Sequence, residues 1–261
     1  YANKGGSSNV FLGVGAGAAN ENGYNNVFLG VKAGEYNIGS NNVFLGLKSG
    51  QWNTAGKDNV FIGLQAGQCN NGKNSDGNVF LGSYAGQLNK DGAANVAVGA
   101  FAGQKNTGGC NNVFLGLASG CNNTDGNDNL FLGTYAGYNN SNGHRNVFLG
   151  YNAGYNNKNS NDNCFIGVNA CYSNENGKNN ISFGNSAGEG MKSGNYNVML
   201  GHEVGKESIG MFDNVVIGHQ AGFRNSSYDN VFIGTKAGFL GINGSCNVYL
   251  GYHSGSNNTG S

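Results

Sequence analysis

A nine-residue block recurs through the whole chain. It reads Asn-Val-Phe-Leu-Gly-Leu-Lys-Ser-Gly at 42–50, and the block and its near copies begin at fifteen asparagines between Asn9 and Asn247. Of the fourteen intervals between these asparagines, eleven are 17 residues long, two are 16 and one is 19. A fixed period of this length is typical of solenoids, in which each coil completes its burial only against its neighbours. We therefore predict one repeat domain over residues 1–261, with about fifteen coils.

Each block begins with a strand signal. Val follows the Asn in twelve of the fifteen repeats, the next residue is usually Phe, Leu or Ile follows in thirteen, and Gly comes next in all of them. Such a run of β-branched and aromatic residues predicts a strand and is too short for a helix. Strands that lie one coil apart run in the same direction, so they form a parallel ladder. The predicted fold is an all-β parallel β-solenoid, or β-roll, of about 17 residues per coil.

The two faces of this strand are both apolar. Side chains alternate along a strand, so the Val and Leu columns share one face and the Phe column points to the other. The small residue that comes four positions after the Leu column is Ala in eleven repeats and Ser in three. A small wall opposite Val and Leu suits a narrow, closely packed roll. We therefore expect Val and Leu inside the coil and Phe outside it.

Polar residues rich in Asn, Asp and Gly separate the blocks and predict turns. The 19-residue interval between Asn59 and Asn78 predicts an enlarged loop at 70–77. The recurring Asn itself is interpreted as structural, because amides stacked one coil apart can form hydrogen bonds along a ladder. The predicted ladder comprises Asn9, Asn26, Asn42, Asn59, Asn78, Asn95, Asn112, Asn129, Asn146, Asn163, Asn180, Asn197, Asn214, Asn230 and Asn247.

The phenylalanine column is the feature that points to function. If Val and Leu fill the roll, a column of phenyl rings is exposed, which exceeds the apolar patch of an ordinary monomer. We expect identical chains to cover this stripe by self-association; the alternative is burial by a second layer or by a wider coil interior. The stripe weakens at Ala97, Ser182, Met199 and Val216. Its members are Phe11, Phe28, Phe44, Phe61, Phe80, Phe114, Phe131, Phe148, Phe165 and Phe232.

Composition argues against several classes of partner. The 14 Lys and Arg balance the 14 Asp and Glu, so neither a nucleic-acid surface nor a polybasic membrane patch is expected. No apolar run approaches the ~20 residues of a membrane span, so we expect no membrane insertion of this segment. Because the chain begins with Tyr1 rather than Met, we expect a processed or excised product.

We find no pattern that indicates catalysis or a cofactor. The carboxylates are scattered through turns, and no nucleophile or phosphate-loop motif appears, so we do not expect an enzyme. Asp-Gly turns allow calcium binding as a minor alternative, although the Gly-Gly-x-Gly-x-Asp repeat is absent. Ice binding is another minor alternative, without the Thr ladder that would support it.

The cysteines and histidines are the candidate metal ligands of the sequence. The six cysteines lack metal-ligand spacing; Cys164 is interpreted as a core substitute for Val, and the others as free or linked between chains. His202 and His219 share a column in neighbouring coils, but without a clear third ligand we favour a polar surface ladder over a metal site.

The repeats resemble those of a known group of fibre proteins. The segments 26–34 and 146–154, each followed by Asn and Gly turns, are similar to repeats in the head domains of YadA-like trimeric autotransporter adhesins and to repeats in phage tail fibres and bacterial surface fibres. The resemblance covers residues 9–255. It implies a left-handed β-roll, trimerisation and attachment to a host or matrix.

The functional hypothesis is therefore a structural or adhesive extracellular fibre protein. We expect it to form a homo-oligomer, with a trimer favoured, and to present polar turns to a host-surface glycan or matrix protein. The expected location is extracellular, on a cell surface or in a virion tail fibre. The alternative is a filament subunit that polymerises end to end, since unpaired strand edges can template addition.

Overall fold

The computed structural model describes residues 6–240 and 244–257. The chain divides into two compact units, Tyr1–Asn129 and Leu130–Ser261. The fold is an all-β parallel β-solenoid of about 14 turns with ~17 residues per turn, which confirms the predicted fold class. The prediction of a single domain over 1–261 and the predicted left-handed coil stay predictions.

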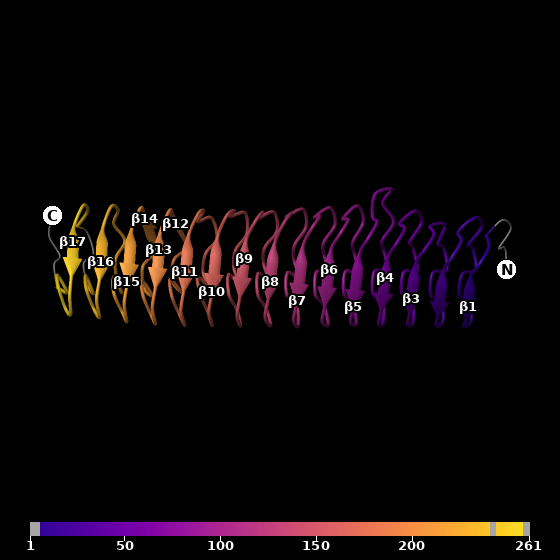
Figure 1. The fold of residues 1–261 in the computed structure, drawn as a ribbon, viewed down its shortest axis with the longest axis horizontal. Helices are drawn as coiled ribbons and strands as arrows, with labels where there is room; N and C mark the ends of the chain where they lie inside the picture. Colours follow the sequence, from indigo (N-terminus) through magenta and orange to yellow (C-terminus); the bar gives the residue numbers. More distant parts are fainter. Residues whose placement is uncertain (1–5, 241–243, 258–261) are drawn as a thin grey trace. The chain divides into compact units, whose positions relative to one another are not determined.

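The first unit contains seven three-residue strands, each lying beside the next in the chain (Figure 1). They are β1 (Val10–Leu12), β2 (Val27–Leu29), β3 (Val43–Leu45), β4 (Val60–Ile62), β5 (Val79–Leu81), β6 (Val96–Val98) and β7 (Val113–Leu115). Consecutive strands pair in parallel with equivalent repeat positions opposite each other; Val43, for example, pairs with Val60, and Phe44 with Phe61. Every side chain of the strand therefore lies in a column of similar side chains.

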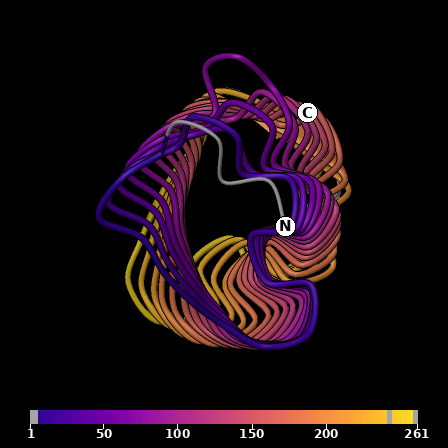
Figure 2. The same cartoon turned by 90° about the vertical axis from the view of Figure 1, so that its right-hand side faces the viewer.

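The second unit follows the same plan with one addition. Its main sheet contains β8 (Leu130–Leu132), β9 (Val147–Leu149), β10 (Cys164–Ile166), β11 (Ile181–Phe183), β13 (Val198–Leu200), β15 (Val215–Ile217), β16 (Val231–Ile233) and β17 (Val248–Leu250). A second parallel pair, β12 (Ser193–Asn195) and β14 (Gly210–Phe212), lies outside this sheet. Within each unit successive coils trace nearly the same path (Figure 2).

After the strand, tight turns carry the chain around the coil. In the third repeat Gly46 has a φ of 133°, Lys48 of 57° and Gly50 of 55°. The amide of Ser49 donates to the carbonyl of Gly46 at 3.3 Å, and the amide of Asn53 donates to that of Gly50 at 3.0 Å. Glycine adopts positive φ at no steric cost, so it recurs at two of these corners. Among the described residues, no helix has the length and apolar character that crossing a membrane requires.

The loop between β4 and β5 extends beyond its neighbours (Figures 1 and 2). It belongs to the 19-residue interval, and the predicted enlargement at 70–77 is confirmed.

The phenylalanines fill the interior of the coil, so the predicted orientation of the strand is wrong. Phe28, Phe44 and Phe61 have no exposed surface and stack with ring centroids 4.8 Å apart. The same holds in the second unit, where Phe148 stacks at 4.8 Å on both Phe131 and Phe165. Within the described residues the Phe column is therefore core packing, and it does not form the exposed self-association stripe expected from the sequence.

The reason for this orientation lies in the glycine that follows the small Ala or Ser. A Cβ placed on Gly50 would lie 2.5 Å from the ring of Phe44. A Cβ on Gly137 would lie 2.4 Å from the ring of Phe131. The missing side chain of this glycine makes room for the flat phenyl ring. The small Ala or Ser before the glycine borders the same ring inside the coil. This space inside the coil fits the phenyl ring, so the Phe side of the strand faces inward. The Val and Leu side of the same strand therefore points outward.

The interior changes where phenylalanine is absent. Ala97 is fully buried in the first unit. In the second unit Ser182, Met199 and Val216 occupy the column, with Met191 and Met211 fully buried beside them. Methionine is flexible enough to fill irregular gaps of this kind. The weakening of the column at Ser182, Met199 and Val216 therefore marks a repacked core.

Candidate interaction surface

Two asparagine ladders hold the coils together. In the predicted ladder, the amide of Asn26 donates to Oδ1 of Asn9 at 2.9 Å, and Nδ2 of Asn26 donates to the carbonyl of Gly39 at 3.0 Å. The same pattern recurs along both units, and nearly all of these asparagines are buried. A buried amide must be hydrogen-bonded to avoid a desolvation penalty, and here every coil supplies the partner for the next. The structural interpretation of this column is confirmed.

Sequence reasoning missed the second ladder. Its asparagines lie three residues after the glycine that faces the phenyl ring, in the segments predicted as turns. Nδ2 of Asn53 donates to Oδ1 of Asn37 at 2.6 Å and to the carbonyl of Gly56 at 2.7 Å. The buried members are Asn20, Asn37, Asn53, Asn70, Asn89, Asn106, Asn123, Asn140, Asn157 and Asn174. Their recurrence at the period of the repeat was the available signal.

In each unit the outward-facing side chains of the sheet form a largely apolar surface, here called the outer face. It consists of the first and third residues of each strand of the main sheet and the residue after the following glycine. Leu47 is 46 % exposed, Leu117 42 % and Leu132 47 %. The flanking coils cover part of each side chain, and the remainder is open to solvent.

The outer face carries no ionic charge. Three positions in fifteen repeats give 45 residues, and none of them is Asp, Glu, Lys or Arg, although the chain has 28 such residues (14 acidic and 14 basic). The solvent-exposed face of a sheet ordinarily carries mainly polar side chains. The absence of charged residues from one face of a protein whose turns carry many of them makes this face a candidate contact surface.

The area of this surface lies at the upper end of the range for apolar patches on monomers. In the first unit, seven strands spaced ~4.8 Å apart and three side-chain columns spaced ~6.6 Å apart outline roughly 600 Å². This value matches the upper end of the largest apolar patch on typical monomers, which is about 300–600 Å². The second unit presents the same two strand columns, while its third column includes the polar residues Thr134, Asn185, His202, His219 and Thr235.

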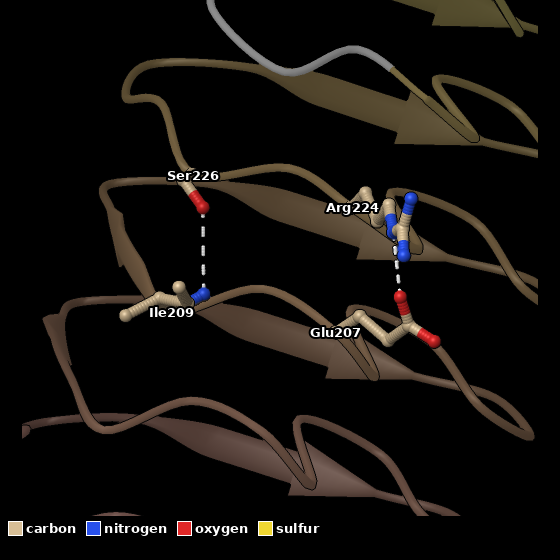
Figure 3. Close-up of a pocket in the computed structure, with 4 residues that line it drawn as sticks. All are labelled: Glu207, Ile209, Arg224 and Ser226. Atoms are coloured by element: carbon tan, nitrogen blue, oxygen red, sulfur yellow. Dashed lines mark hydrogen bonds and ion pairs between the residues drawn. The ribbon is translucent and has the colours of Figure 1, made fainter.

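A shallow pocket in the second unit is lined by Glu207, Ile209, Arg224 and Ser226 (Figure 3). Arg224 Nε donates to Glu207 Oε2 at 2.5 Å, and the amide of Ile209 donates to Ser226 Oγ at 3.4 Å. The guanidinium and the carboxylate neutralise each other. Among the four lining residues, the hydrogen bonds do not join a nucleophilic side chain to a base. We therefore assign it no chemistry.

The cysteines do not form a site. All six are free within the chain, and linkage between chains stays a prediction. Cys164 is the first residue of β10 and lies half-exposed on the outer face, so its interpretation as a core residue is wrong. Cys171 is fully buried, and burial raises its pKa to about 12. The side chain of Ser182 lies beside the Cys171 thiol. Because serine is small, it leaves space at the position where other coils place a phenyl ring.

His202 and His219 lie together, as their shared column predicts. Each follows the glycine after its strand, β13 or β15, and the two rings stack with centroids 5.3 Å apart. Glu203 brings a carboxylate into the same group.

Comparison with protein families, curated proteins and solved structures finds no match for this chain. Its structural class follows from its own geometry, as a parallel β-solenoid repeat protein with asparagine ladders.

Proposed function

We propose that the chain is a structural fibre module that assembles with identical chains through its outer face. The observation that carries the proposal is the uncharged apolar surface on the outward side of the sheet. This surface takes the place of the phenylalanine stripe, which lies inside the coil.

The size of the outer face suits a stable interface. If the first unit alone contributes roughly 600 Å² from each of two copies, the contact buries about 1,200 Å² in total, within the range of specific interfaces. Two apolar sheet faces can pack about 10 Å apart with their side chains interdigitated. A charge-free centre is also typical of the cores of protein interfaces.

The periodicity of the face favours a second copy as the partner. Its apolar ridges repeat at the coil spacing of ~4.8 Å, so only a surface with the same period stays in register along several coils. A copy of this chain has that period. Closed symmetry then buries the face in every subunit, and the resemblance to trimeric adhesin heads and tail fibres favours a trimer.

The setting of this assembly follows from the same resemblance. We propose an extracellular fibre on a cell surface or virion, with the Asn, Gly, Ser, Thr and Tyr turns presented to a host glycan or matrix protein. No enzymatic activity is part of the proposal. An end-to-end filament remains the alternative.

Charge placed on the outer face tests the proposal. The double variant Leu45→Lys, Leu115→Lys puts two ammonium groups on the first unit's face, one on β3 and one on β7, where assembly would bury them. Burying an unpaired charge costs several kcal/mol, so we expect dissociation constants to rise about 100-fold or more. The control Asn74→Lys adds one ammonium group in an exposed turn, outside the outer face.

Mass photometry and sedimentation velocity over a range of concentrations give the result. The proposal requires a closed oligomer for the wild type and for Asn74→Lys, and a folded monomer for the double variant. A monomeric wild type, or a double variant that still assembles, refutes it. Particles that grow without limit as concentration rises favour the filament.

A further inference from the structure

A cluster of three potential metal ligands lies beside the sheet of the second unit. His202, Glu203 and His219 place one ligand atom each within 4.8 Å of the others. We propose that these three side chains bind a divalent transition-metal ion of the zinc class. All three ligands belong to one chain; the two histidines lie in the third column of the second unit's outer face and Glu203 directly follows His202, so the site does not require the contact through the first unit proposed above.

The solenoid fixes the two imidazoles relative to each other. Strands β13 and β15 pair in register, with Leu200 opposite Ile217, and His202 and His219 follow two residues later on each strand. The amide of Gln220 donates to the carbonyl of His202 at 3.0 Å, which holds the two coils together at this point. The rings are stacked with an interplanar angle of 24°, and one ring nitrogen of each residue lies within 4.8 Å of the other.

Glu203 supplies the third ligand that the sequence pattern lacked. Its backbone has a left-handed φ of 54°, as residues at this corner of the coil do in other repeats. Lys206 Nζ donates to Oε1 at 2.7 Å, and Gln220 Nε2 donates to Oε2 at 2.8 Å. Carboxylate ligands of metals are commonly oriented by such partners, and each oxygen retains a further lone pair.

The local charge favours a cation. Lys206 forms an ion pair with Glu203, with 2.7 Å between Nζ and Oε1. Lys206 is also 3.7 Å from a carboxylate oxygen of Glu189. Two carboxylates and one ammonium give this group a formal charge of −1, so Lys206 does not make the site repel metal ions.

The geometry needs only a small adjustment of side chains. Zinc takes imidazole nitrogen and carboxylate oxygen at ~2.0–2.2 Å, which places ligand atoms roughly 3.3 Å apart in a tetrahedral site. Both histidines are exposed, so their rings can rotate inward to reach this separation. Two imidazoles and one carboxylate are a ligand set that zinc uses, with water completing the coordination.

Calorimetric titration of zinc chloride into the metal-free full chain tests the site. We expect one zinc ion per chain bound by the wild type. His202→Asn and His219→Asn should each weaken binding more than ~10-fold, and Glu203→Gln by about 10-fold. Asparagine is a conservative choice because Asn185 occupies the same column one coil earlier, so these variants should fold.

Two controls separate this site from other zinc ligands. His144→Asn removes an imidazole from a different coil and should leave the zinc affinity unchanged. Zinc should also shift the imidazole nitrogen resonances of His202 and His219 in the NMR spectrum. Absence of binding, or binding that the His202→Asn and His219→Asn variants retain undiminished, overturns the proposal.

The titration also distinguishes the metal site from the assembly. The Leu45→Lys, Leu115→Lys variant changes the first unit only and should bind zinc with wild-type affinity. Loss of zinc binding in that variant contradicts a site formed within one chain, whatever the oligomeric state proves to be.

Discussion

Truncation of one stacked phenylalanine tests which face of the strand forms the core. Phe148 has no exposed surface, and its ring lies between those of Phe131 and Phe165, at 4.8 Å from each. The comparison variant changes its neighbour Leu149, which lies half-exposed on the outer face. The two residues are adjacent in one strand, so Phe148→Ala and Leu149→Ala differ mainly in the direction of the side chain.

The expected magnitudes are well separated. Phe→Ala substitutions in cores cost about 3–5 kcal/mol, from lost burial and from the remaining cavity. Ala97 occupies the same column with no exposed surface, so the interior can close partly around a methyl group. We therefore expect about 3 kcal/mol for Phe148→Ala, which is more than a 100-fold change in the unfolding equilibrium. Leu149→Ala should cost less, about 1 kcal/mol, since its side chain is only partly buried and its removal leaves no enclosed cavity.

Urea unfolding followed by far-UV circular dichroism measures both values. The substitutions are made in the Leu45→Lys, Leu115→Lys background, so that loss of subunit contacts does not add to the effect of Leu149→Ala. Amide hydrogen exchange in the coil of β9 reports local loosening, which matters because repeat proteins can open one repeat at a time. If Leu149→Ala proves as destabilising as Phe148→Ala, the inward orientation of the rings is wrong.

Three further predictions concern the ladder, an ion pair and the thiols. Asn112→Ala leaves the carbonyl of Gly126 and the amide of Asn129 without their buried partners. In denaturant titrations it should lower the free energy of unfolding by about 3 kcal/mol. The control Asn74→Ala should change that free energy little. The bidentate hydrogen bonds from Arg145 to Asp162, at 2.6 and 2.9 Å, lower the pKa of Asp162 in the folded state, so their stabilisation is present above the ordinary value of 3.8 and is lost as the pH falls below it. Acid titrations of stability should accordingly show a shallower decline in this range for Arg145→Gln than for the wild type, and an equal decline contradicts the assignment. Iodoacetamide at neutral pH should modify the exposed Cys246 and spare the buried Cys171, as peptide mass spectrometry would show; equal labelling of the two in the folded protein contradicts the burial of Cys171.

The sequence by itself determined the repeat, the parallel strands, the enlarged loop and the first asparagine ladder. These features depend on spacing along the chain: a residue that recurs every turn, such as Asn26 after Asn9, must lie beside its copy once the chain coils. The second ladder was available from the same logic, because Asn37 and Asn53 recur at the repeat period as well.

Only the tertiary structure decided which face of each strand points into the coil. In Val43-Phe44-Leu45 both faces are apolar, so alternation provides no contrast from which inside and outside can be told. The choice depends on which side chain fits the wall opposite, and that wall is made by Gly50, six residues after Phe44 and facing its ring across the coil. Glu203 likewise joined His202 and His219 through the left-handed turn of its backbone and the hydrogen bonds of its carboxylate, which no spacing in the sequence specifies.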